Sequence, residues 1–404
     1  MATTAGLTLD GIDLSDPELY ATGDPHAVWT YLRANAPVFF QKHRYGPGFW
    51  AITRYEDVLK LSTDRRLSSA GGRSTLGTPA QPDAVVADVL VVTDPPKHTQ
   101  LRTIVNKAFT PRIVASLETY VQSVVDRIVD GLVQKKNCDF ATEVAAQIPF
   151  NVICELLGAA EEDRGSLAHA VGHFMESNTH IEAPARNDFE LGRYFLDLAE
   201  QRRHQPGEDL VSRLVEAEVE GESLSNADIL ALCSLLFIAG SETTMNGISG
   251  GLLAFMENPA QRDRIEEDPS LWPKAVEEIL RWVSPVLNGM VRTATEDIEV
   301  REVAIKAGDK VTLWYPSANR DEDVFNNPFA FDVGRDPNPH ITFGAGPHFC
   351  LGASLARLEI RVTLDTVFRR LKKLEPAGDV TRLRSNVSSA IEHLPIRFRG
   401  SLGA

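Results

Sequence analysis

The feature that most constrains this chain is the segment from Phe343 to Gly352, which reads F-G-A-G-P-H-F-C-L-G. Its single cysteine, Cys350, ends a glycine-rich loop, and a helical pattern of apolar residues follows directly. The cysteine is therefore expected at or near a helix N-terminus, where the dipole and unpaired N–H groups stabilise a thiolate. Gly344 is free to adopt positive φ, or to let the backbone pass close to a flat group. His348 can donate a hydrogen bond to a nearby anion.

A thiolate that faces a bulky prosthetic group is one of the ways in which proteins hold haem iron. The loop therefore supports the hypothesis that Cys350 is an iron ligand. The alternative is a buried structural cysteine beside a turn, because a free cysteine often behaves as a small core residue. The motif favours the first interpretation, since this arrangement of glycines around one cysteine rarely arises by chance.

Composition excludes several classes of protein. The chain has 404 residues, of which 43% are hydrophobic, so it can bury a large core, and length alone suggests two or three domains. Its net charge of −15 argues against non-specific binding to nucleic acid or to anionic membranes. The four cysteines are scattered without a C-x-x-C pair, so no disulfide framework or zinc site is implied and a cytoplasmic setting fits.

The sequence also predicts a soluble protein. The N-terminus lacks the basic residues and the apolar run of a signal peptide or an anchor. The most apolar stretch, from Ile229 to Ala239, covers 11 residues. A helix that spans a bilayer needs about 20 apolar residues, so this stretch is too short.

Several segments predict strands, loops and helix starts. Residues 36–55 read as strands around a turn at Gly46 to Gly48, and residues 297–315 read as short strands. Residues 70–92 are rich in Gly, Ser, Pro and Ala, which predicts a long loop of the kind that serves as a lid or binding segment. Asp94, followed by two prolines, predicts a helix start with an Asp cap.

The helix that Asp94 opens carries His98 and Arg102, which are four residues apart and share one face. Two such donors could bind carboxylate or phosphate groups. For this pair taken alone, an ordinary solvated helix face is the favoured interpretation.

Ser225 and Asp228 predict a capping box that opens a long apolar helix ending at about Asn258. Its middle, residues 239–244, reads A-G-S-E-T-T and places polar residues inside a core helix; such conflicts with local propensity tend to mark function. Thr243 can donate to the carbonyl of Ala239, four residues back.

The expected result is a groove that holds the hydroxyl of Thr243 and the carboxylate of Glu242, beside space opened by Gly240. Such a groove could bind a small polar ligand and relay protons. The alternative is a polar patch where the helix reaches the surface. Further along, Glu278 and Arg281 predict an i, i+3 ion pair at the end of a hydrophobic helix, a spacing that also occurs elsewhere in the chain.

In this order, the segments resemble the cytochrome P450 family of haem-thiolate monooxygenases in its soluble bacterial form, over nearly the whole chain. The cysteine loop is the strongest match, and residues 239–244 resemble the oxygen-activating segment of the family's long central helix. Glu278 and Arg281 resemble its E-x-x-R pair, with Arg335 as the third member. Three further segments are typical of the family: 94–102, 108–112 and 318–321, the last reading A-N-R-D.

The resemblance implies a mainly α fold with small β-sheets (α+β), in a single domain spanning residues 1–404. Haem b would lie between the long central helix and the helix that follows the cysteine loop, with Cys350 as the axial thiolate ligand of the iron. Glu242 and Thr243 would deliver protons to bound dioxygen. Glu278, Arg281 and Arg335 would hold the core behind the cysteine loop.

The resemblance also implies residues for the cofactor and the substrate. The residues expected to bind haem, the first four through its propionates, are His98, Arg102, Arg292, His348, Cys350, Phe343, Gly344, Gly352, Ala239 and Gly240. The residues expected to line an apolar substrate pocket are Leu235, Leu236, Val286, Leu287, Asn288, Met290, Val291 and Ile391, with His173 and Asn178 as further polar contacts. A medium-to-large apolar metabolite fits, such as a macrolide, polyketide, terpenoid, steroid or aromatic compound.

Electrons would come from a separate ferredoxin or flavodoxin with its NAD(P)H-dependent reductase, because the chain shows no flavin or nicotinamide domain. An acidic carrier would dock on the cysteine side of a monomer, near Lys97, Lys107, Arg112, Arg357 and Arg361. The rival activities are a peroxide-using peroxygenase, a phenol-coupling oxidase, a nitric-oxide reductase and a non-catalytic haem binder. The acid–alcohol pair argues against the first and last of these, and no basic cluster suggests the nucleotide site of a reductase.

Overall fold

The structure is a computed structural model that describes residues 4, 6–43, 46–70, 90–169, 188–219, 221–289 and 291–400. Its helices are α1 Glu18–Ala21, α2 Pro25–Asn35, α3 Tyr55–Leu61, α4 Lys97–Asn106, α5 Pro111–Ser116, α6 Glu118–Val133, α7 Gln147–Leu157, α9 Asp188–His204, α10 Leu210–Val215, α11 Asn226–Glu257, α12 Pro259–Glu267, α13 Trp272–Val283, α14 Tyr315–Ala318 and α15 Ala353–Arg370. Its strands are β1 Val38–His43, β2 Gly46–Ile52, β3 Leu67–Ser68, β4 Asn137–Asp139, β5 Glu218–Val219, β6 Glu222–Ser223, β7 Val291–Ala294, β8 Ile298–Val300, β9 Val303–Ile305, β10 Lys310–Leu313, β11 Leu371–Pro376, β12 Thr381–Arg382, β13 Ile391–His393 and β14 Pro395–Gly400. The predicted mainly α fold with small sheets is confirmed.

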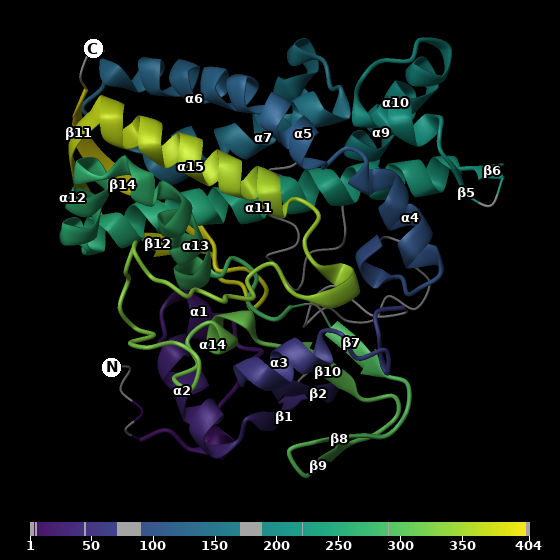
Figure 1. The fold of residues 1–404 in the computed structure, drawn as a ribbon, viewed down its shortest axis with the longest axis vertical. Coiled ribbons are helices and arrows are strands. Elements are labelled where there is room, and N and C mark those ends of the chain that lie inside the picture. The colour runs from purple at the N-terminus through teal and green to yellow at the C-terminus, as the bar shows by residue number, and fades with distance from the viewer. Residues whose placement is uncertain are drawn as a thin grey trace.

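Helix α11 runs through the middle of the molecule, with α15 and α6 on one side and the largest sheet on the other (Figure 1). The predicted capping box opens it: the Ser225 hydroxyl accepts from the Asp228 N–H, and the Asp228 carboxylate accepts from the Ser225 N–H. Among the described helices, α11 alone is long and apolar enough to cross a membrane, a test that core helices also pass. It packs against α7, α9, α13 and α15.

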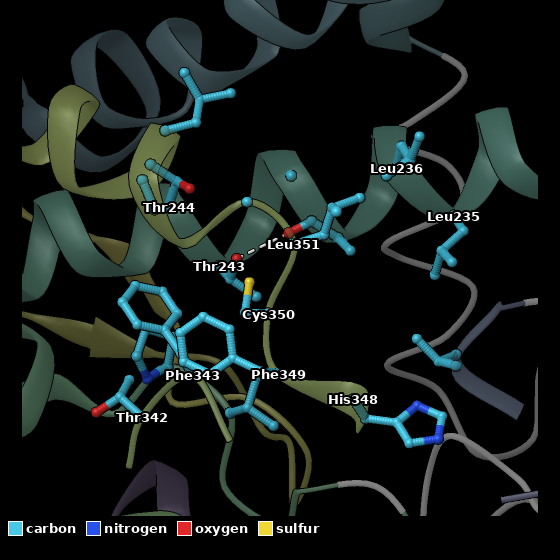
Figure 2. A pocket seen from close by; sticks show the side chains of 18 of the residues that line it. Leu235, Leu236, Thr243, Thr244, Thr342, Phe343, His348, Phe349, Cys350 and Leu351 are labelled. Carbon is cyan, nitrogen blue, oxygen red and sulfur yellow. Dashed lines mark hydrogen bonds between the residues drawn. The ribbon is translucent and has the colours of Figure 1, made fainter. Parts of the chain in front are cut away.

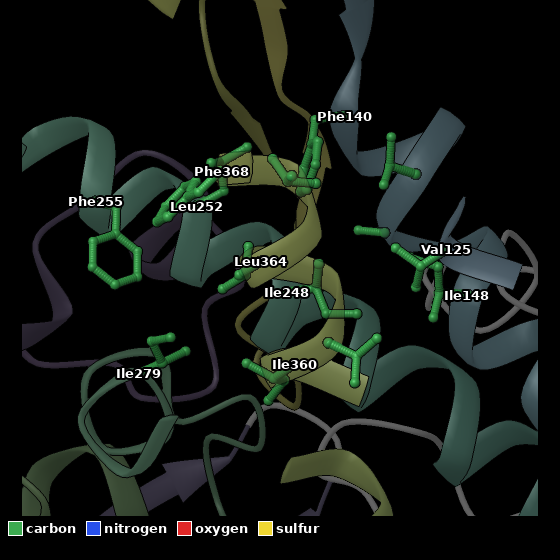
Figure 3. Packing of buried hydrophobic residues seen from close by; sticks show 14 of the residues in the cluster. Val125, Phe140, Ile148, Ile248, Leu252, Phe255, Ile279, Ile360, Leu364 and Phe368 are labelled. Carbon is green, nitrogen blue, oxygen red and sulfur yellow. The ribbon is translucent and has the colours of Figure 1, made fainter. Parts of the chain in front are cut away.

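The contact between α11 and α15 forms the centre of the largest apolar core (Figure 3). The side chains that meet there include Ile248, Leu252 and Phe255 of α11, and Ile360, Leu364 and Phe368 of α15. A Cβ at Gly247 would lie 2.9 Å from Cδ1 of Ile360, so glycine allows this close approach. Because α15 begins three residues after Cys350, the contact holds the cysteine loop against α11.

The largest sheet has five strands in the order β1-β2-β10-β7-β3. It confirms the strands expected around residues 36–55, but Gly46 to Gly48 lie inside β2 because its antiparallel pairing with β1 extends to Gly46, opposite His43. Tyr55 begins helix α3 and is not part of the strand. Pairing of β7 with β10 sets Arg292 opposite Val311 and so places Arg292 at the edge of the site described below.

Helix α4 begins at Lys97, close to the predicted start, but Asp94 does not cap it. The carboxylate of Asp94 instead accepts from the Ser69 N–H at 2.8 Å and from the hydroxyl of Ser68. Pro96, two residues after Asp94, lacks one of the two N–H groups that a capping side chain could bind. Asp94 therefore ties the start of α4 to the end of β3.

Candidate functional site

A pocket of about 270 Å³ lies between the middle of α11 and the loop that leads into α15. Figure 2 shows Thr243 of α11 and Cys350 of the loop beside it. The pocket wall also draws on α4, α7, α13, β7 and α14. Nine of the ten predicted cofactor residues lie in it: His98, Arg102, Ala239, Gly240, Arg292, Phe343, His348, Cys350 and Gly352.

Two glycines shape the cysteine loop. Gly344 and Gly346 both have φ near +71°, a conformation that glycine adopts without strain. A Cβ at Gly346 would lie 2.9 Å from the carbonyl oxygen of Ser62, at the end of α3. The loop closes where the Cys350 N–H donates to the Phe343 carbonyl at 2.8 Å. Gly344 is the predicted cofactor residue outside the wall, and its part in the site is this backbone turn.

Cys350 lies two residues before the N-cap position of α15, close to the predicted helix N-terminus. Burial raises the pKa of its thiol, while a hydrogen bond from the Gly352 N–H and the charges of Arg102 and Arg357 lower that pKa. The sulfur is nevertheless exposed, because it faces the pocket. A cation bound in the pocket beside the sulfur would reverse the effect of burial and stabilise the thiolate.

Four basic side chains gather at one edge of the pocket. The rings of His98 and His348 have centroids 4.2 Å apart, and Arg292 reaches His348 through the hydroxyl of Ser69. Burial and the charge of Arg102 lower the pKa of His98, and burial with Arg292 lowers the pKa of His348 to about 3. Nε2 of His98 is buried and has no partner among the described residues. This group of donors suits a ligand with negatively charged oxygen atoms.

In the polar segment of α11, residues 239–244, the side chains point in different directions. Thr243 lines the pocket and donates to the Ala239 carbonyl at 2.8 Å, as predicted. Glu242 is not in the pocket wall; burial raises the pKa of its carboxyl, and the nearby Ser388 hydroxyl lowers it. Adjacent residues on a helix point about 100° apart, so the two side chains leave α11 in different directions.

Glu359 was missed from the sequence, and Ser388, expected with residues 388–391 in the substrate pocket, does not line it. Ser388 accepts from Asn246 Nδ2 at 3.0 Å, and its hydroxyl lies near the Glu242 carboxyl, whose pKa it lowers. Glu359 lines the pocket from α15, and its Oε2 has no partner in the described part of the chain. Burial raises the pKa of the Glu359 carboxyl to about 8. The signal for Glu359 was an acid placed directly between two apolar residues, Leu358 and Ile360.

The predicted ion-pair cluster is present and buried. Glu278 accepts from Nε and Nη2 of Arg281 at 2.8 Å each, and from Nε of Arg335 at 3.0 Å. Arg281 also donates to three backbone carbonyls, those of Asn319, Pro328 and Ala330. The cluster therefore ties α13 to the irregular segment that leads to the cysteine loop.

Of the predicted substrate residues, Leu235, Leu236 and Val286 line the pocket. Leu287 and Ile391 do not: they line a second cavity and pack into apolar clusters. For Leu287 the reason is the extended backbone after α13, where successive side chains point in opposite directions.

The remaining substrate residues are buried elsewhere or lie outside the described chain. Asn288 is fully buried and donates to the Asn386 carbonyl at 3.1 Å, and Val291 is buried in β7 opposite Thr312. The predicted residues outside the described ranges are Met290, His173 and Asn178, together with residues 71–89 of the predicted loop.

The basic residues expected on the cysteine side are partly paired. Arg357 binds Glu277 at 2.6 Å, and Arg361 binds Glu118 at 2.6 Å. Arg112 is exposed at the start of α5, which packs against α15. The positive charge available to a partner on this side is therefore smaller than the sequence suggests.

Comparison with known proteins identifies the family. The family model described as Cytochrome P450 matches residues 191–391. The chain is 39% identical to the methyl-branched lipid omega-hydroxylase of Mycobacterium tuberculosis over 96% of this chain and 94% of that protein. It is 35% identical to the steroid C26-monooxygenase of the same organism, over 96% and 93%.

Comparison with a solved structure supports the same family. The Mycobacterium marinum cytochrome P450 in complex with pseudoionone is 34% identical and superposes with a TM-score of 0.89, covering 98% of this chain and all of that one. Coverage of this extent includes the pocket, the cysteine loop and the helices around them. This chain belongs to the cytochrome P450 family and is a monooxygenase.

Proposed function

We propose that this chain, as one cytoplasmic domain, holds haem b through Cys350 and inserts one oxygen atom from dioxygen into an apolar small molecule. The observation that carries the proposal is the position of Cys350, whose sulfur faces the pocket from the N-terminal end of α15. The family is one whose members carry haem with a cysteine thiolate ligand.

The residues present fit that cofactor. The unpaired Nε2 of His98 and the cations Arg102 and Arg292 suit the two propionates of haem, since each would form charge-assisted hydrogen bonds. Gly240 leaves the α11 side of the pocket without a side chain, so a flat group can lie close to the helix. Bound haem would supply activation of dioxygen, and thiolate donation favours O–O cleavage.

The iron ligand is tested by the carbon-monoxide difference spectrum of the dithionite-reduced protein. A strongly red-shifted Soret band is expected for the wild type and should disappear in Cys350→Ser. Cys138→Ser is a matched control, because Cys138 is buried in β4 away from the pocket. A red-shifted band that persists in Cys350→Ser would overturn the assignment.

We further infer that Thr243 and Glu242 move protons towards the pocket. Thr243 holds its hydroxyl at the wall, and Glu242 holds a carboxyl of raised pKa one residue earlier. A proton passes between them when the Glu242 side chain rotates or when a water molecule bridges the two groups. Thr243→Ala should retain the Soret spectrum but divert electrons from product to peroxide or water. Thr244→Ala, a neighbouring hydroxyl in the same wall, should leave coupling unchanged.

We propose a lipid or steroid-like substrate within the wider class of apolar metabolites. The pocket wall away from the basic edge is mostly aliphatic or aromatic, with Leu90, Phe109, Ile153 and Leu236 among its residues. Two relatives are named for a methyl-branched lipid and a steroid. Titration with a branched fatty acid, a steroid and a macrolide should produce a low-to-high-spin shift with one of the first two. A shift with the macrolide alone would contradict this choice.

A further inference from the structure

A second cavity, of about 480 Å³, shares no lining residue with the pocket described above. Its wall is formed by α1, α2, the C-terminal half of α11, the end of α13 and residues 382–391. Arg320, from the A-N-R-D segment, also lines it. Apart from Ser388, neither oxygen activation nor substrate binding in the first pocket accounts for the polar groups found here.

Arg320 is a buried cation whose donors are largely unused. It is 3% exposed, and its guanidinium stacks over the Trp282 ring at 4.6 Å. Nη2 donates to the Trp282 carbonyl at 2.8 Å, but Nε and Nη1 have no partner among the described residues. No described carboxylate lies within ion-pair distance of Arg320, whereas every guanidinium nitrogen of nearby Arg281 is bonded. A buried cation without a partner is costly, which indicates a missing anion.

A second unpaired donor lines the same cavity. Trp29 is 1% exposed, and its Nε1 has no partner among the described residues. His26, also in the wall, packs edge-on against Trp29 with ring centroids 5.1 Å apart. Burial lowers the pKa of His26 well below its usual value, and the charges of Arg320 and Arg382 lower it further, which indicates a positive potential in the cavity.

We propose that this cavity binds a small organic monocarboxylate, whose oxygen atoms accept hydrogen bonds from Arg320 and from Nε1 of Trp29. One carboxylate balances the buried guanidinium of Arg320. A dianionic phosphate fits less well, because Glu257 and Asp24 also line the wall and would repel a second negative charge. Apolar wall residues suit a short hydrocarbon chain: Leu253, Val283 and Leu287.

The proposal is tested on the haem-loaded protein with acetate as the probe and acetamide as a neutral probe of the same shape. At constant ionic strength, acetate should bind by calorimetry and raise the unfolding temperature, whereas acetamide should do neither. The Soret band should not move, because the cavity and the haem pocket share no residue. Equal effects of acetamide, equal affinity for inorganic phosphate, or a Soret shift that accompanies binding would each overturn the proposal.

Two variants locate the site. Trp29→Phe keeps the ring but removes the N–H, and should weaken acetate binding by about fivefold. Arg320→Gln removes the charge and should abolish detectable acetate binding. If this variant does not fold, Arg320→Lys replaces it. Lysine keeps the charge but has a single nitrogen, so this variant should weaken acetate binding. Arg397→Gln, an exposed residue paired with Glu375, is the control and should bind acetate normally.

Unchanged affinity in Trp29→Phe and in the folded Arg320 variant would contradict the site. So would a crystal structure at saturating acetate in which only ordered water contacts Arg320. Because these measurements do not depend on turnover, their failure is distinct from any failure of the proposed monooxygenase substrate.

Discussion

At the scale of single residues, the contact between Glu242 and Ser388 connects the proposed proton donor to a distant segment of the chain. Ser388 accepts from Asn246 and lies near the Glu242 carboxyl, where it opposes the effect of burial on the carboxyl pKa. Hydrogen bonding to the charged form of an acid lowers its pKa, whereas desolvation raises it. The hydroxyl of Ser388 therefore adjusts the pH range over which Glu242 can exchange a proton.

Replacing Ser388 by alanine should shift the pH dependence of product formation. Without the hydroxyl, burial acts unopposed and the pKa of Glu242 rises further, so the midpoint assigned to Glu242 should move to higher pH. The measurement is the pH profile of turnover at saturating substrate. Ser389→Ala, in the same segment, is the matched control and should retain the wild-type midpoint. A midpoint that stays fixed or falls in Ser388→Ala would show that the hydroxyl does not hold the carboxylate.

The raised pKa of Glu359 predicts that the stability of the protein depends on pH. Its folded pKa of about 8 lies above the unfolded value, which is about 4.3, so between these values the native state binds more protons than the unfolded state. Stability should therefore fall as pH rises through this window. Glu359→Gln should remove this loss and exceed the wild type by on the order of 3 kcal/mol at pH 7, with no difference near pH 4.

Urea unfolding of both proteins at several pH values measures this effect. Glu375→Gln, which changes an exposed acid on β11, controls for the loss of one negative charge. Parallel pH profiles for the wild type and Glu359→Gln would contradict the raised pKa.

At the scale of elements, α13 and the segment before the cysteine loop are joined by a buried charge cluster. Glu278 is fully buried between the guanidinium groups of Arg281 and Arg335. It also accepts from the backbone N–H of Asp332 at 2.9 Å and from Nδ2 of Asn338 at 3.2 Å. The cluster replaces regular secondary structure in this segment as the means of holding its position.

Glu278→Gln should destabilise the protein by about 3–5 kcal/mol, because two guanidinium groups lose a buried counter-charge. Haem content after expression should fall as well, since the cluster anchors the segment that leads to Cys350. Urea unfolding and the ratio of Soret to protein absorbance are the measurements. Glu375→Gln removes an exposed partner of Arg397 and should cost less than about 1 kcal/mol. Equal losses in the two variants would refute the structural role of the cluster.

At the scale of the whole molecule, the net charge is −15, yet the family resemblance implies a basic surface that binds an acidic redox partner. Arg357 and Arg361 are paired with Glu277 and Glu118, so we expect exposed residues such as Arg112 to attract such a partner. Charges at the rim of an interface affect the association rate more than the dissociation rate.

Arg112→Glu should slow electron transfer from a ferredoxin at low ionic strength, and the difference from the wild type should shrink as salt is added. Stopped-flow reduction of the carbon-monoxide complex by reduced ferredoxin measures this rate. Arg399→Glu makes the same charge change on β14 and should have little effect. A slower rate that is independent of salt, or equal slowing in Arg399→Glu, would place the docking surface elsewhere.

Local chemistry accounts for what the sequence alone determined. The capping box of α11, the positive φ of Gly344 and the bond from Thr243 to Ala239 each depend on residues close together in the chain. The pairing of Glu278 with Arg281 follows from their spacing on one helix. Because each of these features is local, the sequence was enough to predict them and the family resemblance that they carry.

The tertiary structure decided which residues far apart in the sequence meet one another. Only the packed chain shows that Glu242 turns towards Ser388, that Leu287 and Ile391 line a second cavity, and that Arg320 is buried without a counter-ion among the described residues. The physical reason is that the direction of a side chain and the partners it meets depend on neighbouring elements, whereas caps and turns depend on the adjacent residues alone.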